Sequence, residues 1–424
     1  MVSKKTLGLM GIPILVVVLY IQFTGLNIPF WDQWFFARHL RLFMNGQLTF
    51  DILLSQHNEH RPFFPRLIWL TLAGFTHYNI KAELWTNFFI AIGTFTFFAR
   101  RALRTWQEQK AETPTFLLPL LALLIFNLGS RESWIQGFQT IMFLGMACII
   151  IGVFFLTDKT WGKFIVAALL GVIANFSMVN GLFYWPLGAV ILLLNENGRP
   201  RIVKMVSWLA ISAVTVGFFL NGWSSSAKIN FPYLITHPLE WLAWLLNFLG
   251  APILAFWYVA WVFGILGSIL FTIILSQTFR SGVWRSVLPY LAIAAFVLGT
   301  TFVISLGRME FGLRQSTVSR YLTMSAWFWA SLISMLPLVK IPRLRSGYIY
   351  LLLTASLTFL TIAGGWVGYV RLYLRILPAY QAVIAGEPLS AEALAQVHPY
   401  PDQSAEDIDF MTKNQLAAWY YAKK

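Results

Sequence analysis

The sequence predicts an all-α, polytopic membrane protein. Hydrophobic residues make up 58% of the chain and charged residues only 11%, and the mean hydropathy is positive. This composition excludes an ordinary soluble globular protein. The apolar runs are long and uninterrupted, without the alternation of barrel strands, so the spans are expected to be helices, which satisfy their own backbone polar groups in lipid.

About eleven membrane spans are predicted. The first covers roughly residues 7–24 and is expected to be retained, because no small-residue cleavage site follows it. Lys4 and Lys5 precede it and place the N-terminus in the cytoplasm. The other spans are expected near residues 80–98, 116–129, 140–157, 164–178, 182–194, 205–221, 256–276, 286–304, 323–339 and 347–366.

The charge distribution supports this topology. The segments placed in the cytoplasm hold sixteen Lys and Arg against four acids, as the positive-inside rule requires. The net charge of +14 therefore reflects loops between spans, and no nucleic-acid partner is predicted. Cys148 is the single cysteine, so an intramolecular disulfide and a cysteine metal site are excluded. Residues 1–366, including an outer loop at 25–79, form the predicted transmembrane domain, and residues 367–424 form a small extracytoplasmic helical tail.

The first outer loop gathers charge directly after the first span. Asp32 opens an amphipathic helix there, and a short apolar run from Leu67 to Phe75 is expected to form a second helix lying in the interface. Aspartate is a preferred N-cap residue, and taken locally this role is simpler than that of a catalytic base. The loop is nevertheless the first place to look for function, because ionisable groups beside lipid are costly.

Later in the same loop an acid, a cation and two titratable rings fall within five residues. The segment reads His57-Asn58-Glu59-His60-Arg61 and precedes a proline that keeps it extended. A solvated polar loop is the simplest alternative to a functional site. Binding of a divalent metal is also open, although the spacing matches no helical zinc signature.

Four arginines lie in the predicted outer loops that follow the first one, where positive charge is disfavoured in short segments. They are Arg131, Arg308, Arg314 and Arg320. A phosphate ligand would compensate for them, because guanidinium groups match phosphate oxygens bidentately. Structural ion pairs with Glu132 and Glu310 explain them equally well. Tyr321 follows Arg320 where the tenth predicted span begins.

This layout resembles the GT-C class of integral-membrane glycosyltransferases, which use polyprenyl-phosphate-linked sugars. The resemblance lies in the cytoplasmic N-terminus, the loop acid Asp32, the interfacial helices of that loop, the number of spans and the extracytoplasmic C-terminal part. It implies that Asp32 is the general base for an acceptor hydroxyl, with Glu59 as the next candidate. The residues expected to contact substrate are His57, His60, Arg61, Arg131, Glu132, Arg308, Arg314, Arg320 and Tyr321.

The expected protein is therefore a multi-pass glycosyltransferase of the cell inner membrane with its active face outside. Its expected partners are the lipid bilayer, a polyprenyl-phosphate-linked sugar donor, and a glycan or lipid acceptor, because the tail is too small to resemble the soluble domains of many relatives. A transporter or flippase of lipid-linked sugars is the main alternative. Such proteins usually place ionisable residues or broken helices near the midplane, and this sequence shows neither clearly. A membrane acyltransferase is a third interpretation, but its intramembrane histidine has no counterpart in the predicted spans.

Overall fold

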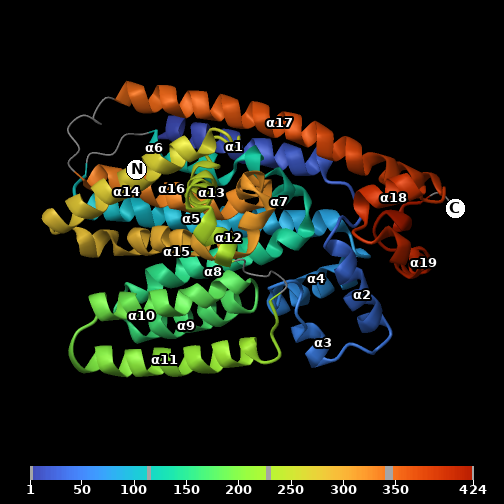
Figure 1. The fold of residues 1–424 in the computed structure, drawn as a ribbon, viewed down its shortest axis with the longest axis horizontal. Coiled ribbons are helices and arrows are strands. Elements are labelled where there is room, and N and C mark those ends of the chain that lie inside the picture. Colours follow the sequence, from blue (N-terminus) through green and yellow to red (C-terminus); the bar gives the residue numbers. More distant parts are fainter. Residues whose placement is uncertain (1–2, 112–115, 226–230, 340–346, 423–424) are drawn as a thin grey trace.

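The computed structural model describes residues 3–111, 116–225, 231–339 and 347–422. Within those ranges the chain is nearly all helical and contains no strand, apart from one isolated antiparallel bridge between His57 and His60. Long helices run side by side along the molecule, and the shorter helices of the first outer loop gather at the same end as the C-terminus (Figure 1).

Seven segments in the described ranges are long and apolar enough to cross a membrane. They are α1 (Lys4–Thr24), α5 (Ile80–Glu108), Gly137–Leu156 with α8 (Thr140–Leu156), α11 (Gly198–Leu220), α14 (Ala260–Arg280), Trp284–Phe311 with α15 (Trp284–Arg308), and Ser319–Leu338 with α16 (Ser319–Met335). The prediction of a multi-pass helical membrane protein is confirmed at this level. The predicted total of about eleven membrane spans stays a prediction.

Three of the predicted spans correspond to shorter helices. These are α6 (Leu117–Ile125), α9 (Trp161–Asn175) and α10 (Tyr184–Asn195). The nine residues of α6 rise only about 14 Å, which is half of a typical hydrocarbon core. Its extension toward residue 129 is not α-helical, because Asn127 ends the run and its side chain accepts a hydrogen bond from the backbone N–H of Gly129.

The last predicted span is part of a much longer helix. Helix α17 (Gly347–Ala385) continues without a break through residue 366, although Gly364 and Gly365 favour a helix end in sequence. It packs on η1 (Leu128–Ser130) and α7 (Arg131–Ile135). Two glycines permit this close approach: a Cβ at Gly365 would lie 2.5 Å from the Cβ of Leu128, and one at Gly368 would lie 2.6 Å from Nε of Arg131.

The first outer loop and the C-terminal tail pack together. The loop forms α2 (Gln33–Met44), α3 (Phe50–Leu54) and α4 (Phe63–Thr76), and the tail forms α18 (Ala391–Val397) and α19 (Ala405–Lys413). The backbone N–H of Trp31 and the indole N–H of Trp34 both donate to the carbonyl of Val397, at 2.8 and 3.1 Å. The tail therefore holds the segment that carries Asp32.

The other helices of the described residues are shorter, and the longest of them packs on α14. They are η2 (Gly137–Gln139), η3 (Val179–Phe183), α12 (Phe231–Thr236), α13 (Pro238–Gly250), η4 (Met309–Phe311), η5 (Leu313–Thr317), η6 (Leu336–Leu338), η8 (Pro401–Gln403) and η9 (Ala417–Tyr420).

Candidate functional site

Asp32 occupies the N-cap position of α2, but its carboxylate is not used as a cap. Its side chain makes no capping hydrogen bond to the described backbone. Instead, Oδ1 lies 3.3 Å from Nε2 of His57. The Asp32 side chain remains 30% exposed. The simpler role suggested by local sequence therefore does not account for this carboxylate, which is open to a second partner.

A buried polar chain holds the turn before Asp32. The side-chain amide of Gln33 donates to Oε2 of Glu83 on α5 at 2.9 Å, and its oxygen accepts the backbone N–H of Phe30 at 3.3 Å. Trp31 adopts a positive φ of 50°, which is uncommon for a residue with a side chain. The Phe30–Asp32 turn is thus held by Gln33 at the start of α2, whose side chain is anchored in turn on α5.

His57 is held by aromatic rings and by a tight turn. Its ring packs edge-on against Phe35 at 4.8 Å and Phe138 at 4.9 Å between centroids. Its backbone exchanges two hydrogen bonds with His60, at 2.8 and 2.9 Å, and Asn58 between them has a positive φ of 49°. The turn points the imidazole of His57 at Asp32.

His60 has a structural partner on η3. Its Nδ1 accepts the backbone N–H of Val179 at 3.0 Å. Burial lowers the pKa of His60 to about 4, and the neighbouring His57 and Arg308 act in the same direction against the opposing carboxylates of Glu59 and Asp32. His60 is therefore neutral at physiological pH, with its proton on Nε2.

Glu59 pairs with a distant cation. Its carboxylate lies 3.3 Å from Nη2 of Arg308 at the end of α15, and its carbonyl accepts the indole N–H of Trp223 at 3.1 Å. The other cation of the predicted cluster, Arg61, is held by carbonyl groups: it donates to Leu54 at 3.3 Å and to Asn221. These contacts tie the loop to two later segments of the chain.

Arg66 is a loop-fixing residue that the sequence analysis missed. It is buried on α4 and donates to the carbonyl groups of Leu53 at 2.7 Å and Ser55 at 2.6 Å. An arginine inside the apolar run that follows Pro62 was the available signal, because such a side chain is seldom fully buried without partners.

The second group of predicted residues surrounds Arg320. This guanidinium lies 4.0 Å from Glu132 and 5.6 Å from the ring centroid of Tyr321, which is itself buried. The carboxylates of Glu132 and Asp32 both interact electrostatically with Arg320. Arg314 is exposed, with no carboxylate within 4.0 Å among the described side chains. Three of the arginines for which phosphate was considered lie between residues 308 and 320. Two of them, Arg308 and Arg320, are already in ion pairs.

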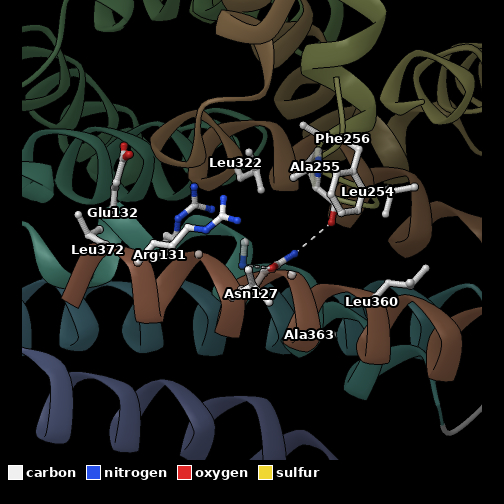
Figure 2. A pocket seen from close by; sticks show the side chains of 18 of the residues that line it. Asn127, Arg131, Glu132, Leu254, Ala255, Phe256, Leu322, Leu360, Ala363 and Leu372 are labelled. Atoms are coloured by element: carbon white, nitrogen blue, oxygen red, sulfur yellow. Dashed lines mark hydrogen bonds between the residues drawn. The ribbon is translucent and has the colours of Figure 1, made fainter. Parts of the chain in front are cut away.

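A cavity of about 620 Å³ lies next to this group. It is bounded by η1 and α7, by the connection between α13 and α14, and by α17. Its polar lining includes Arg131, Glu132, Arg371 and Arg375, and most of its other residues are apolar. Figure 2 shows Arg131 and Glu132 toward one end, with Leu360 and Phe256 toward the other. The cavity therefore has a cationic end and an apolar end.

Arg375 connects the cavity with the first outer loop. Its guanidinium carbon lies 5.5 Å from the ring centroid of Trp31, the residue before Asp32, and 6.0 Å from that of Phe30. Arg371 and Arg375 were not predicted as site residues, because residues beyond 366 were expected to form a separate tail. Their spacing of four residues on one helix, one turn beyond Gly368, was the available signal.

The metal-ligand alternative gains no geometric support. Among the described residues, no group of three or more His, Cys, Asp or Glu is placed to hold a metal ion. His57 and Glu59 instead face different partners, Asp32 and Arg308.

Comparison with protein-family models, curated proteins and solved structures finds no match for this chain. The functional argument therefore depends on the chemistry of the residues themselves.

Proposed function

We propose that this protein is a membrane glycosyltransferase that moves a sugar from a polyprenyl-phosphate-linked donor to a glycan or lipid acceptor outside the cell inner membrane. In this proposal the fold is GT-C-like, with about eleven spans, a cytoplasmic N-terminus and the first outer loop at the active face. Asp32 is the general base.

The proposed reaction transfers the sugar from the lipid phosphate to the acceptor hydroxyl in one displacement. The acceptor hydroxyl oxygen forms a bond to the anomeric carbon while its proton passes to Asp32. The bond between the anomeric carbon and the phosphate oxygen breaks, and its electron pair leaves with the polyprenyl phosphate. Cations near the leaving oxygen stabilise the developing charge. His57 orients the carboxylate of Asp32 across the 3.3 Å contact.

The cavity supports a lipid-linked donor. Arg131, Arg371 and Arg375 at its lining can bind phosphate oxygens through charge-assisted hydrogen bonds. The apolar residues that complete the lining suit a prenyl chain. This assignment retains Arg131 from the predicted phosphate set and adds the two arginines of α17, because Arg308 and Arg320 are paired with carboxylates.

One observation carries the proposal: a partly exposed carboxylate, not used as a helix cap, is joined through Trp31, the residue before it, to a cation-lined and otherwise apolar cavity. The link between them is direct, since Arg375 packs on the ring of Trp31. A base whose neighbouring residue packs on an arginine of the phosphate site fits transfer to a hydroxyl.

The same cavity also favours a second function, a flippase or transporter of lipid-linked sugars, because such a protein needs the same headgroup contacts. Purified protein in proteoliposomes with a radiolabelled polyprenyl-phosphate sugar separates the two. Release of polyprenyl phosphate that depends on the protein and on added acceptor supports the transferase. Movement of intact lipid-linked sugar across the bilayer, without cleavage, would replace it with the transporter.

A further inference from the structure

A second cationic and apolar surface lies on α5, at the end opposite the first outer loop. It borders a hollow of about 490 Å³, and every described residue that lines it comes from α5. They are Phe89, Ile92, Gly93, Thr96, Phe97, Arg100, Arg101 and Arg104. We call this surface the α5 stripe. Its residues recur at intervals of three and four, so they share one face of the helix.

The apolar half of the α5 stripe is open. Phe89 is 64% exposed, and a Cβ built on Gly93 would meet no described atom within 4 Å. Gly93, between the exposed ring of Phe89 and the half-buried side chains of Ile92 and Phe97, leaves a shallow trough. An extended hydrocarbon chain fits such a trough by van der Waals contact.

The cationic half of the α5 stripe has no counter-charge from the described residues. Within the described part of the chain, no carboxylate lies within 4.0 Å of Arg100, Arg101 or Arg104, as the ion pairs found there show. Arg101 is fixed against α8, with its guanidinium carbon 5.1 Å from the ring centroid of Phe154. Arg100 and Arg104 are exposed and one turn apart. Three positive charges therefore face the space at the end of the trough.

The dimensions of the α5 stripe match one leaflet. From residue 89 to residue 100 the helix rises about 16 Å, close to half of a hydrocarbon core about 30 Å thick. With the arginines at headgroup depth, Phe89 lies near the bilayer midplane. The apolar half then meets acyl chains while the cationic half meets phosphates.

We propose that the α5 stripe binds an anionic phospholipid, with its phosphate on Arg100 and Arg104 and one acyl chain in the trough over Gly93. The positive-inside rule places this end in the cytoplasmic leaflet, where anionic headgroups are attracted to basic segments. The charge of the lipid complements the unpaired cations of the stripe. The site is independent of the glycosyltransferase proposal, because it lies at the other end of α5.

The test titrates the purified full-length protein in detergent with phosphatidylglycerol and, separately, with phosphatidylcholine of the same acyl chains, and counts bound lipids by native mass spectrometry. The triple variant Arg100→Gln, Arg101→Gln, Arg104→Gln is expected to weaken phosphatidylglycerol binding on the order of 100-fold, at about fivefold per arginine. The matched control is Arg199→Gln, Arg201→Gln, two exposed arginines at the start of α11 that lie outside the stripe. This control should bind as the unmodified protein does.

A second variant tests the trough without changing charge. Gly93→Phe fills it and should weaken phosphatidylglycerol binding about tenfold while leaving the arginines in place. Inorganic phosphate at millimolar concentration should not displace the lipid. The proposal is overturned if the protein binds the two lipids equally, or if the α11 control loses phosphatidylglycerol binding as much as the triple variant does. It is also overturned if Gly93→Phe leaves phosphatidylglycerol binding unchanged, or if inorganic phosphate displaces the lipid.

Discussion

Arg308 and Glu59 form an ion pair, with Nη2 of the arginine 3.3 Å from Oε2 of the glutamate, across 249 residues of chain. The pair joins the end of α15 to the first outer loop. Glu59, the second candidate for the catalytic base, therefore holds the loop to α15, whereas Asp32 makes no such contact with a later helix in the described part of the chain.

Glu59→Gln should leave turnover within about tenfold of the unmodified protein and lower stability by about 1 kcal/mol, because both side chains are partly exposed and solvent screens the pair. Sugar transfer and apparent Tm are the measurements. Glu406→Gln is the control, since it removes an ion pair with Arg41 at 2.7 Å in which the carboxylate is far more exposed than that of Glu59. A loss of transfer as complete as that of an Asp32 variant would make Glu59 the base.

The cavity arginines should set donor affinity. Arg371→Gln and Arg375→Gln are each expected to raise the KM for the lipid-linked donor roughly 10- to 100-fold, as for loss of a hydrogen bond to a charged group. The KM for the acceptor should not change. Arg314→Gln is the control, because Arg314 is exposed and does not line the cavity. A raised KM for the donor in Arg314→Gln, with no change in Arg371→Gln and Arg375→Gln, would instead place the donor phosphate at the arginines between residues 308 and 320.

The contact between α17 and α7 offers a backbone test. Gly368→Ala should displace Arg131 and weaken donor use, because the new Cβ would lie 2.6 Å from Nε of that arginine. Gly364→Ala, one turn earlier on the same helix, meets no described atom within 4 Å and should be neutral or slightly stabilising. Donor kinetics of both variants are compared. Identical kinetics would show that the position of Arg131 does not matter.

Acid should destabilise the first outer loop through His60. In the folded protein its pKa is lowered to about 4 from 6.5, so the unfolded chain binds the proton first as pH falls. Stability is fully present above pH 6.5 and declines toward pH 4, by up to about 1.4 kcal/mol per pH unit. His60→Asn should reduce this decline, since the amide oxygen can still accept the N–H of Val179.

Apparent Tm between pH 7.5 and 5 measures the effect. His39 contributes in the same direction, because burial also lowers its pKa to about 4, so the double variant with His39→Asn should show the flatter profile. An unchanged pH slope in both variants would contradict the account.

Hydropathy predicted the helical membrane class because the cost of burying backbone polar groups in lipid is independent of tertiary detail. It did not predict that α6 stops at Ile125, since that end depends on Asn127 bonding Gly129 and the carbonyl of Pro252 at 3.0 Å. Nor did it predict that α17 runs past residue 366, because the packing of Gly365 on Leu128 outweighs the low helix propensity of glycine.

In the candidate site, too, the sequence predicted what local composition determines and missed what depends on tertiary packing. Local composition pointed to Asp32 and His57, and the structure brings these two together. The sequence suggested Glu132 as an ion-pair partner for these arginines, but matching it to Arg320 required knowing that α16 and α7 pack side by side. The four-residue spacing of Arg371 and Arg375 could have indicated a shared helix face, but not the contact of Arg375 with Trp31, which joins distant parts of the sequence.

The most direct test of the central claim is release of polyprenyl phosphate from a labelled lipid-linked sugar by Asp32→Asn protein. The amide keeps the size of the carboxylate but cannot take a proton near neutral pH, so transfer should fall on the order of 100- to 10,000-fold. Because Asp32 makes no capping bond to the described backbone, apparent Tm should stay close to that of the unmodified protein. Near-normal release of polyprenyl phosphate by a stably folded Asp32→Asn protein would contradict the assignment of Asp32 as the base.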